Sequence, residues 1–269
     1  MKALSFGRNY RFIFKLIFTV FSDNVLMENE IRNIYALVAY FLIPGALVAV
    51  GYGFAAKLMI DWKLPNIVGL GISAIVIMIP IELGAIIQYS KSNYGESSIS
   101  LGIQYNENVT MKYYFIYTPI TLIWAILSFV IGNPISKYIK DGLFSWIPSW
   151  YVLSDNFSPY NKTQLLIALF FMVFVTGLAL PIVEELYFRG FLLPRMEWMG
   201  IYAPILNAAL FSLYHFWSPW QFIVRVVALI PFCYVSYKTK SIKIPIIVHC
   251  LLNIMGDSGS VISQLKKVW

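Results

Sequence analysis

Charged residues are scarce in this chain. Of its 269 residues only 12% are Asp, Glu, Lys or Arg, whereas 59% are hydrophobic and 17% are aromatic. An average soluble domain has roughly 25% charged residues. This composition excludes a sizeable soluble domain and predicts a single integral membrane domain, residues 1–269. We expect an all-α, polytopic helical bundle, because long apolar runs are typical of membrane-spanning helices.

Cysteine is also scarce, and the common hydrolase motifs are absent. The two cysteines, Cys233 and Cys250, both lie within apolar stretches, which argues against a disulfide framework. No serine occupies a nucleophile-elbow motif, and the zinc-binding pattern HExxH is absent. The chain therefore does not fit the usual serine hydrolases or zinc proteases.

The net charge of +7 does not indicate a nucleic-acid partner in this context. Basic residues beside membrane spans set the topology and contact anionic lipid, so the bilayer is the expected partner. Counting Lys and Arg on alternate connections predicts a cytoplasmic N-terminus for a multi-pass protein of the cell membrane. On that topology we expect the polar site described below to face the cytoplasmic side.

The hydropathy pattern predicts about seven spans, within a range of six to eight. Residues 1–30 are expected to form an interfacial amphipathic helix, with a short first span as the alternative. Residues 133–162 contain three prolines and several aromatic residues, and we expect them to lie at the interface as a non-spanning connection. The predicted spans are 33–56, 64–88, 113–132, 165–189, 201–217, 220–237 and a last one that starts near 244.

The stretch around which the chain is organised is the fourth span. Leu165 to Val183 carries no charge, and Glu184, Glu185 and Arg189 follow. Glu185 and Arg189 are four residues apart, so we expect them to pair on one helical face near the inner end of the helix. Glu184 is rotated by about 100° and is left free to face another partner.

The chain has only two histidines, and both lie in apolar segments. His215 follows Phe211 by four residues, and Asn253 follows His249 by four, so each pair lines one helical face. A single buried histidine usually bonds a neighbouring helix. Two histidines together with Glu184, each on a different helix, indicate a polar site inside the membrane.

These residues match the needs of peptide hydrolysis. A carboxylate removed from water, here Glu184, is a better general base, and His215 beside it can hold and polarise the attacking water. His249 and Asn253 can donate hydrogen bonds to the oxyanion that forms on the scissile carbonyl. As an alternative, Glu184, His215 and His249 could together supply the three protein ligands of a catalytic zinc.

Two further charges lie within predicted spans. Glu82 and Arg225 fall outside the motifs, and we expect each to pair with a neighbouring helix, with a substrate contact as the alternative.

Three short motifs occur in order on apolar segments: EExxxR at 184–189, FxxxH at 211–215 and HxxxN at 249–253. This ordered set resembles the CAAX protease and bacteriocin-processing family (CPBP, or Abi), to which the type II CAAX prenyl endopeptidases belong. The resemblance covers about residues 165–256.

The resemblance implies an intramembrane glutamate endopeptidase of a family formerly classed as metalloproteases. Glu184 would be the base, His215 would activate water, and His249 with Asn253 would form the oxyanion hole. The other motif residues would support them: Glu185, Arg189 and Phe211. No cofactor is expected, with Zn²⁺ as the alternative. The substrate would be a membrane-associated, lipidated or signal- or bacteriocin-type peptide. The alternative function is a non-catalytic membrane immunity or scaffold protein of the same family.

Overall fold

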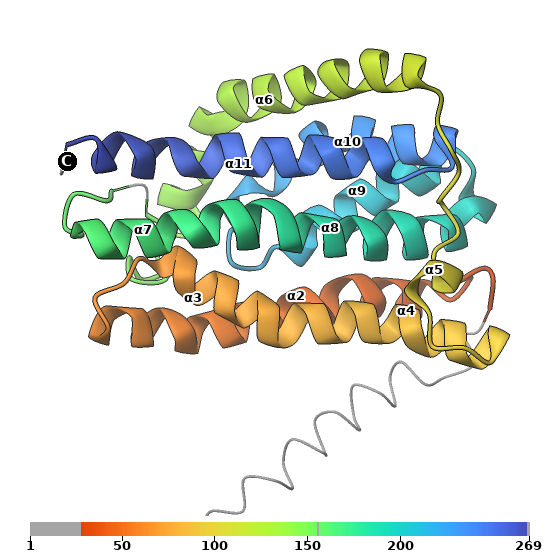
Figure 1. Cartoon of the computed structure of the whole chain (residues 1–269), viewed down its shortest axis with the longest axis horizontal. Helices are drawn as coiled ribbons and strands as arrows, with labels where there is room; N and C mark the ends of the chain where they lie inside the picture. The colour runs from red at the N-terminus through yellow and green to blue at the C-terminus, as the bar shows by residue number, and fades with distance from the viewer. Residues whose placement is uncertain (1–27, 155, 268–269) are drawn as a thin grey trace, which may run out of the picture.

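A computed structural model describes residues 28–154 and 156–267. Helices account for most of this part of the chain (Figure 1). The main helical elements are α2 (Ile34–Asp61), α3 (Asn66–Ser73), η2 (Ala74–Met78), α4 (Ile79–Tyr94), α5 (Ile99–Gly102), α6 (Met111–Gly142), α7 (Lys162–Phe170), η3 (Phe171–Ala179), α8 (Leu180–Glu184), η4 (Glu185–Leu192), η5 (Leu193–Met199), α9 (Tyr202–Tyr214), η6 (Pro219–Gln221), α10 (Phe222–Thr239) and α11 (Lys243–Leu265). The predicted interfacial helix at residues 1–30 falls largely outside the described residues.

Six of the described helical stretches are long and apolar enough to cross a membrane. They are Ile34–Asp61, Asn66–Tyr94, Met111–Gly142, Lys162–Met199, Pro219–Thr239 and Lys243–Leu265. The prediction of an all-α, polytopic membrane bundle is confirmed. The predicted span at 201–217 corresponds to α9, which is not among these six because it has only 13 residues. At 1.5 Å per residue it is about 20 Å long, shorter than the roughly 30 Å hydrocarbon core.

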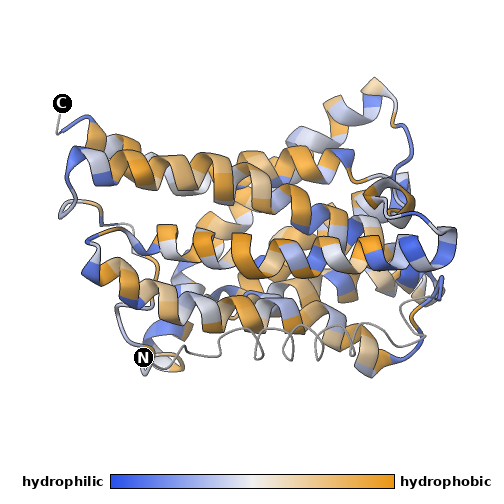
Figure 2. Ribbon diagram, turned by 60° about the horizontal axis from the view of Figure 1, so that its bottom comes forward, coloured by the Kyte–Doolittle hydropathy of each residue, from blue (hydrophilic) through white to orange (hydrophobic). Residues whose placement is uncertain are grey.

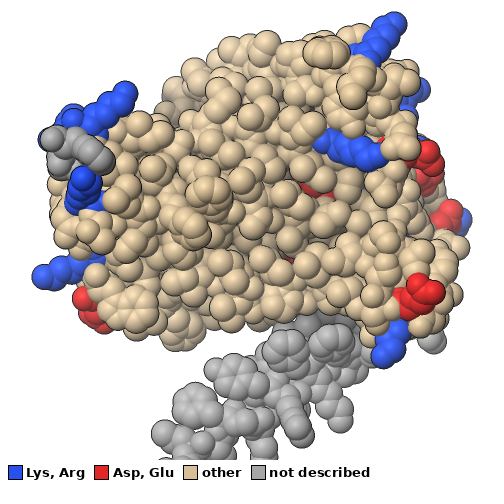
Figure 3. All heavy atoms as spheres, viewed as in Figure 1, with Lys and Arg blue, Asp and Glu red and all other residues tan. Residues whose placement is uncertain are grey.

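The surface of the bundle fits a lipid environment. Large apolar side chains such as Phe54, Phe115 and Ile131 are more than two-thirds exposed, and hydrophobic positions continue around the outer helix surfaces (Figure 2). Exposed Lys, Arg, Asp and Glu gather at the two ends of the molecule and leave a band between them nearly free of charge on the face shown in Figure 3. These features indicate an integral membrane protein.

The continuous helical stretch Lys162–Met199 lies in the middle of the bundle (Figure 1). α2, α3 and α4 lie on one side of it, and α11, α10 and α6 lie on the other. η3 packs against α11, and α10 packs against both α6 and α9. A capping box begins this stretch, because Asn161 accepts a hydrogen bond from the Gln164 backbone and the Gln164 side chain accepts one from Asn161.

Two predicted helix boundaries are wrong. α6 does not stop at Gly132 but continues through Pro134 to Gly142, because proline is tolerated in membrane helices where packing and local adjustments satisfy the freed backbone groups. Arg189 does not lie at the end of its helix, since the helical stretch continues to Met199. The Glu184 motif therefore lies well inside the bundle.

Candidate functional site

Two wide π-helical segments, η3 and η4, flank Glu184 on the central stretch. Such segments occur frequently at functional sites. Within η3, a Cβ atom added at Gly177 would lie 2.7 Å from Ile254 Cγ1 on α11. The missing side chain thus lets α11 approach closely, and Asn253 Nδ2 donates to the Thr176 carbonyl at 2.9 Å. This contact aligns α11 with the helix that carries Glu184.

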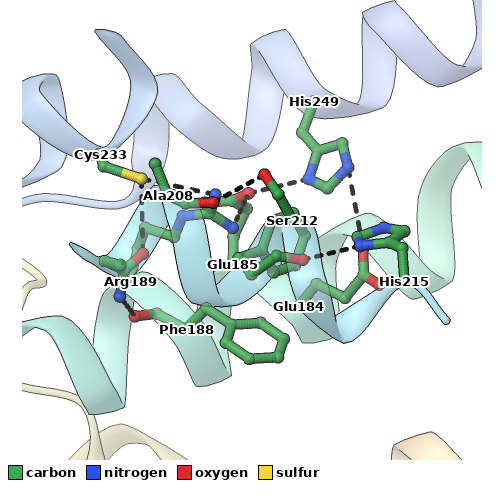
Figure 4. A network of polar contacts seen from close by, with 11 residues as sticks. Glu184, Glu185, Phe188, Arg189, Ala208, Ser212, His215, Cys233 and His249 are labelled. Atoms are coloured by element: carbon green, nitrogen blue, oxygen red, sulfur yellow. Dashed lines mark hydrogen bonds and ion pairs between the residues drawn. The ribbon is translucent and has the colours of Figure 1, made fainter. Parts of the chain in front are cut away.

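Glu185 lies at the centre of a buried polar network (Figure 4). Its Oε1 accepts from Arg189 Nη1 at 3.0 Å, and both side chains are fully buried. The same oxygen lies 2.8 Å from His249 Nδ1. The expected pair between Glu185 and Arg189 is therefore present, and it also orients His249 from a helix distant in sequence. Arg189 is further covered by the Phe211 ring, 4.1 Å from the guanidinium carbon.

Glu184 meets this network only through His249, from the side opposite to Glu185. Its Oε2 lies 3.7 Å from His249 Nε2, so the two nitrogens of one imidazole face the two adjacent carboxylates. Glu184 and His249 are 6% and 5% exposed, and both line a pocket. One carboxylate is thus held by Arg189, whereas the other is presented to the pocket.

His215 follows the last residue of α9, where the backbone leaves the helical conformation. Its Nδ1 lies 2.8 Å from the Phe211 carbonyl oxygen. A carbonyl oxygen only accepts hydrogen bonds, so this contact places the proton on Nδ1 and leaves the lone pair on Nε2. The ring packs against Phe211, Tyr214 and Trp217. Its orientation is therefore fixed by packing and by one hydrogen bond.

The pocket has a volume of about 660 Å³. Four side chains predicted to act in catalysis line it: Glu184, His215, His249 and Asn253. Phe211 also lines it, whereas Glu185 and Arg189 lie behind the wall. Apolar residues from α3, η2, α6 and α11 form much of the remaining surface. The arrangement can hold an apolar ligand beside a small group of acid, imidazole and amide side chains.

Arg225 also lines the pocket, and the motifs do not include it. It forms no ion pair within the described part of the chain; its partners there are Ser218 Oγ, Gln221 Oε1 and, at 3.4 Å, the Ser212 carbonyl. Glu82 is fully buried, and neither carboxylate oxygen has a hydrogen-bond partner among the described residues. Neither residue forms an ion pair among the described residues, but each meets a neighbouring helix: Arg225 donates to the Ser212 carbonyl of α9, and Glu82 lies beside the Tyr214 side chain of the same helix. In the sequence, Glu82 and Arg225 could be recognised only as charges inside apolar runs.

The pocket extends from Glu184 toward the end of the bundle where Lys140, in the last turn of α6, residues 152–154 and Gly256 lie. The Lys240–Lys243 turn and the start of α2 lie at the opposite end. There the Ile31 N–H donates to the Arg195 carbonyl, and Lys240 pairs with Glu197. Residues 1–27 lie outside the described part of the chain, so the cytoplasmic N-terminus and the cytoplasmic opening of the site are two separate predictions. The side of the membrane for either one stays a prediction.

Metal binding has little support from the geometry. Residues 28–154 and 156–267 contain no group of three or more His, Cys, Asp or Glu side chains that is arranged to hold a metal ion. Glu184, His215 and His249 share the pocket but do not form such a ligand set.

The fold and the site together define a class: a polytopic helical membrane protein with a polar, acid-containing pocket inside the bundle. Residues 166–255 match the family model of the type II CAAX prenyl endopeptidase Rce1-like proteins. This match confirms the resemblance to the CAAX protease family and spans all three motifs. It indicates a peptidase of CAAX type that acts at the membrane. No curated protein and no solved structure matches the chain significantly.

Proposed function

We propose that this protein is an intramembrane endopeptidase in which Glu184 activates a water molecule for attack on a peptide bond. The observation that carries the proposal is the division between adjacent carboxylates. Glu185 is held by Arg189 and His249, whereas Glu184 faces the pocket without a cation from its own helix. A carboxylate that is nearly buried at the wall of a pocket is suited to take a proton from water.

The attacking water would lie between Glu184 and His215. Glu184 accepts one proton, while the unprotonated Nε2 of His215 accepts a hydrogen bond from the second O–H. The water oxygen then forms a bond to the carbonyl carbon, and the carbonyl oxygen becomes an oxyanion. Glu184 later returns its proton to the amine as the C–N bond breaks, so atoms and charge balance.

His249 and Asn253 would stabilise the oxyanion. The Nδ1–H of His249 donates to Glu185, and an imidazolium form would present Nε2–H to the pocket. Asn253 uses one Nδ2 hydrogen for the Thr176 carbonyl and keeps the second. A donor aimed at an oxyanion contributes about 3 kcal/mol in an enclosed site.

The apolar wall of the pocket supports a substrate that is itself membrane-associated. A lipidated peptide, a signal peptide or a bacteriocin-type peptide each presents apolar groups beside its backbone. A non-catalytic immunity or scaffold protein would need the pocket for binding but would not need a free carboxylate at Glu184.

Glu184→Gln tests the proposal, because it removes the base and keeps the size of the side chain. Protein reconstituted in liposomes is incubated with farnesylated, signal-type and bacteriocin-leader peptides, and cleavage is followed by mass spectrometry. We expect cleavage of at least one class by the unchanged protein and a loss on the order of 100-fold in the variant. Glu197→Gln, further along the same helical stretch and exposed, is the matched control and should cleave normally.

Cleavage at an unchanged rate by a folded Glu184→Gln variant would overturn the proposal in favour of the binding function. A parallel assay with a chelator tests the zinc alternative. We expect no loss after chelation; a loss that added Zn²⁺ restores would assign Glu184, His215 and His249 to the metal instead.

A further inference from the structure

Among the described residues three arginines are buried, and two of them contact an acid or aromatic rings. Arg189 pairs with Glu185 and lies over the Phe211 ring. Arg195 lies 3.9 Å from the ring centroids of both Tyr89 and Phe191. These contacts offset part of the cost of removing a cation from water.

Arg225 has neither kind of partner within the described residues. It is only 7% exposed, yet its three hydrogen bonds go to uncharged oxygens. A guanidinium has five N–H donors, so Nε–H and one N–H of Nη1 remain. Ser218 and Gln221 hold the Nη2 corner in place at 2.8 and 2.7 Å. The guanidinium is thus fixed on one side, while its remaining donors have no partner among the described residues and are available to a ligand in the pocket.

The position of Arg225 makes an unpaired charge more costly. It lies in the first turn of α10, where the helix dipole disfavours cations. The described charged residues that line the pocket are Lys140, Glu184 and Arg225, so cations outnumber carboxylates there. Glu184 is near enough to interact electrostatically with Arg225 but does not form an ion pair with it. An anion in the pocket would satisfy both the charge and the remaining donors.

We propose that Arg225 binds a carboxylate of the peptide that occupies the pocket. This inference deepens the proposed function, because it assigns a charged feature to the substrate of the same site. A carboxylate oxygen accepts a stronger hydrogen bond from a guanidinium than a neutral oxygen does, and Nε–H or the remaining Nη1–H can donate that charge-assisted bond. The carboxylate belongs either to a C-terminus or to an Asp or Glu side chain.

The test measures binding rather than cleavage, so that it does not depend on catalysis. Full-length Glu184→Gln protein in nanodiscs is titrated with three fluorescent, N-palmitoylated apolar hexapeptides. The first has a free C-terminal carboxylate, the second a C-terminal amide, and the third an amide together with one Glu side chain. We expect at least one of the two carboxylate peptides to bind about 10-fold or more tightly than the amide, as a charge-assisted bond predicts.

Arg225→Gln in the same background should abolish this preference and leave the affinity for the amide peptide unchanged, which also shows that the variant is folded. Lys140→Gln is the matched control, since it removes the other cation of the pocket and should keep the preference.

Comparing the first and third peptides identifies the source of the carboxylate. Equal affinity for all three peptides in the presence of Arg225, or a preference that survives Arg225→Gln or disappears in Lys140→Gln, would overturn the inference. Absence of cleavage would bear on the proposed function alone.

Discussion

Two groups in this bundle are built from the same three kinds of side chain at different depths. In the first, Glu185 pairs with Arg189 at 3.0 Å, and Arg189 lies over Phe211. In the second, Glu197 pairs with Lys240 at 2.6 Å, and Lys240 Nζ lies 4.8 Å from the Tyr105 ring centroid. We call them the buried group (Glu185, Arg189, Phe211) and the end group (Glu197, Lys240, Tyr105).

The groups differ in access to water. The buried acid and cation have no exposed side-chain surface, whereas those of the end group are each 41% exposed. Water can replace either partner of the end group, so that ion pair contributes little to stability. In the buried group each partner depends on the other, because an unpaired buried charge is costly. The same chemistry therefore has a large effect at one depth and a small effect at the other.

The groups also differ in what they position. The buried group extends to His249 through Glu185 and so orients a side chain that lines the pocket. The end group joins connections outside the pocket: Tyr105 donates to Glu197, and the neighbouring Asn106 forms a bridge with Ser241. Burial and the Glu197 carboxylate raise the pKa of Tyr105, so its phenol stays a donor. The buried group orients a side chain of the site, and the end group holds connecting segments together.

The largest effect on stability is expected from Arg189→Gln. This change leaves the buried Glu185 carboxylate without its cation, and breaking a buried pair costs about 3–5 kcal/mol. Unfolding by SDS in mixed micelles measures the loss. Arg189→Lys is the matched control: it keeps the charge but lacks the planar guanidinium over Phe211, so its loss should be smaller. If Arg189→Gln lowered the free energy of unfolding by less than about 1 kcal/mol, the buried ion pair would contribute no more than an exposed one.

An intermediate effect is expected from Phe211→Leu. Phe211 contacts Arg189 by its ring face and lies edge-on to Phe188 and His215. Losing the cation–π contact and these aromatic contacts should cost about 1–2 kcal/mol while the apolar volume is largely kept. The same unfolding assay checks this value. Tyr237→Leu is the comparison, because this half-buried ring also faces a cation, the Nζ of Lys240 at 4.4 Å, and it should cost less. An equal or larger loss there would contradict the role of depth.

Local spacing was enough to predict part of this comparison. The four-residue interval between Glu185 and Arg189 predicts their contact, because neighbours on one helix are set by helical geometry. The apolar runs likewise predict the helical bundle. The contact between Glu185 and His249 joins residues 64 positions apart, and no single-helix pattern carries that information.

Other features depended on packing that one sequence does not reveal. α6 continues past Pro134 because its surroundings tolerate the proline, which local propensity does not predict. Which N–H donors of Arg225 stay free depends on how α10 packs beside the pocket. Its partner on the neighbouring helix is the Ser212 carbonyl rather than a carboxylate, which the charge visible in the sequence does not specify.

The smallest effect is expected from Lys240→Ala, which removes the cation of the end group. Because this pair is partly exposed, its loss should cost about 0.2–1 kcal/mol. Salt gives a sharper test than the magnitude alone, since exposed charges are screened within about 10 Å at 0.1 M ionic strength and buried charges are screened much less. Raising the NaCl concentration should therefore shrink the difference between unchanged protein and Lys240→Ala, while the loss caused by Arg189→Gln stays nearly constant. If both losses fell in parallel with salt, the buried group would have to be as accessible to solvent as the end group.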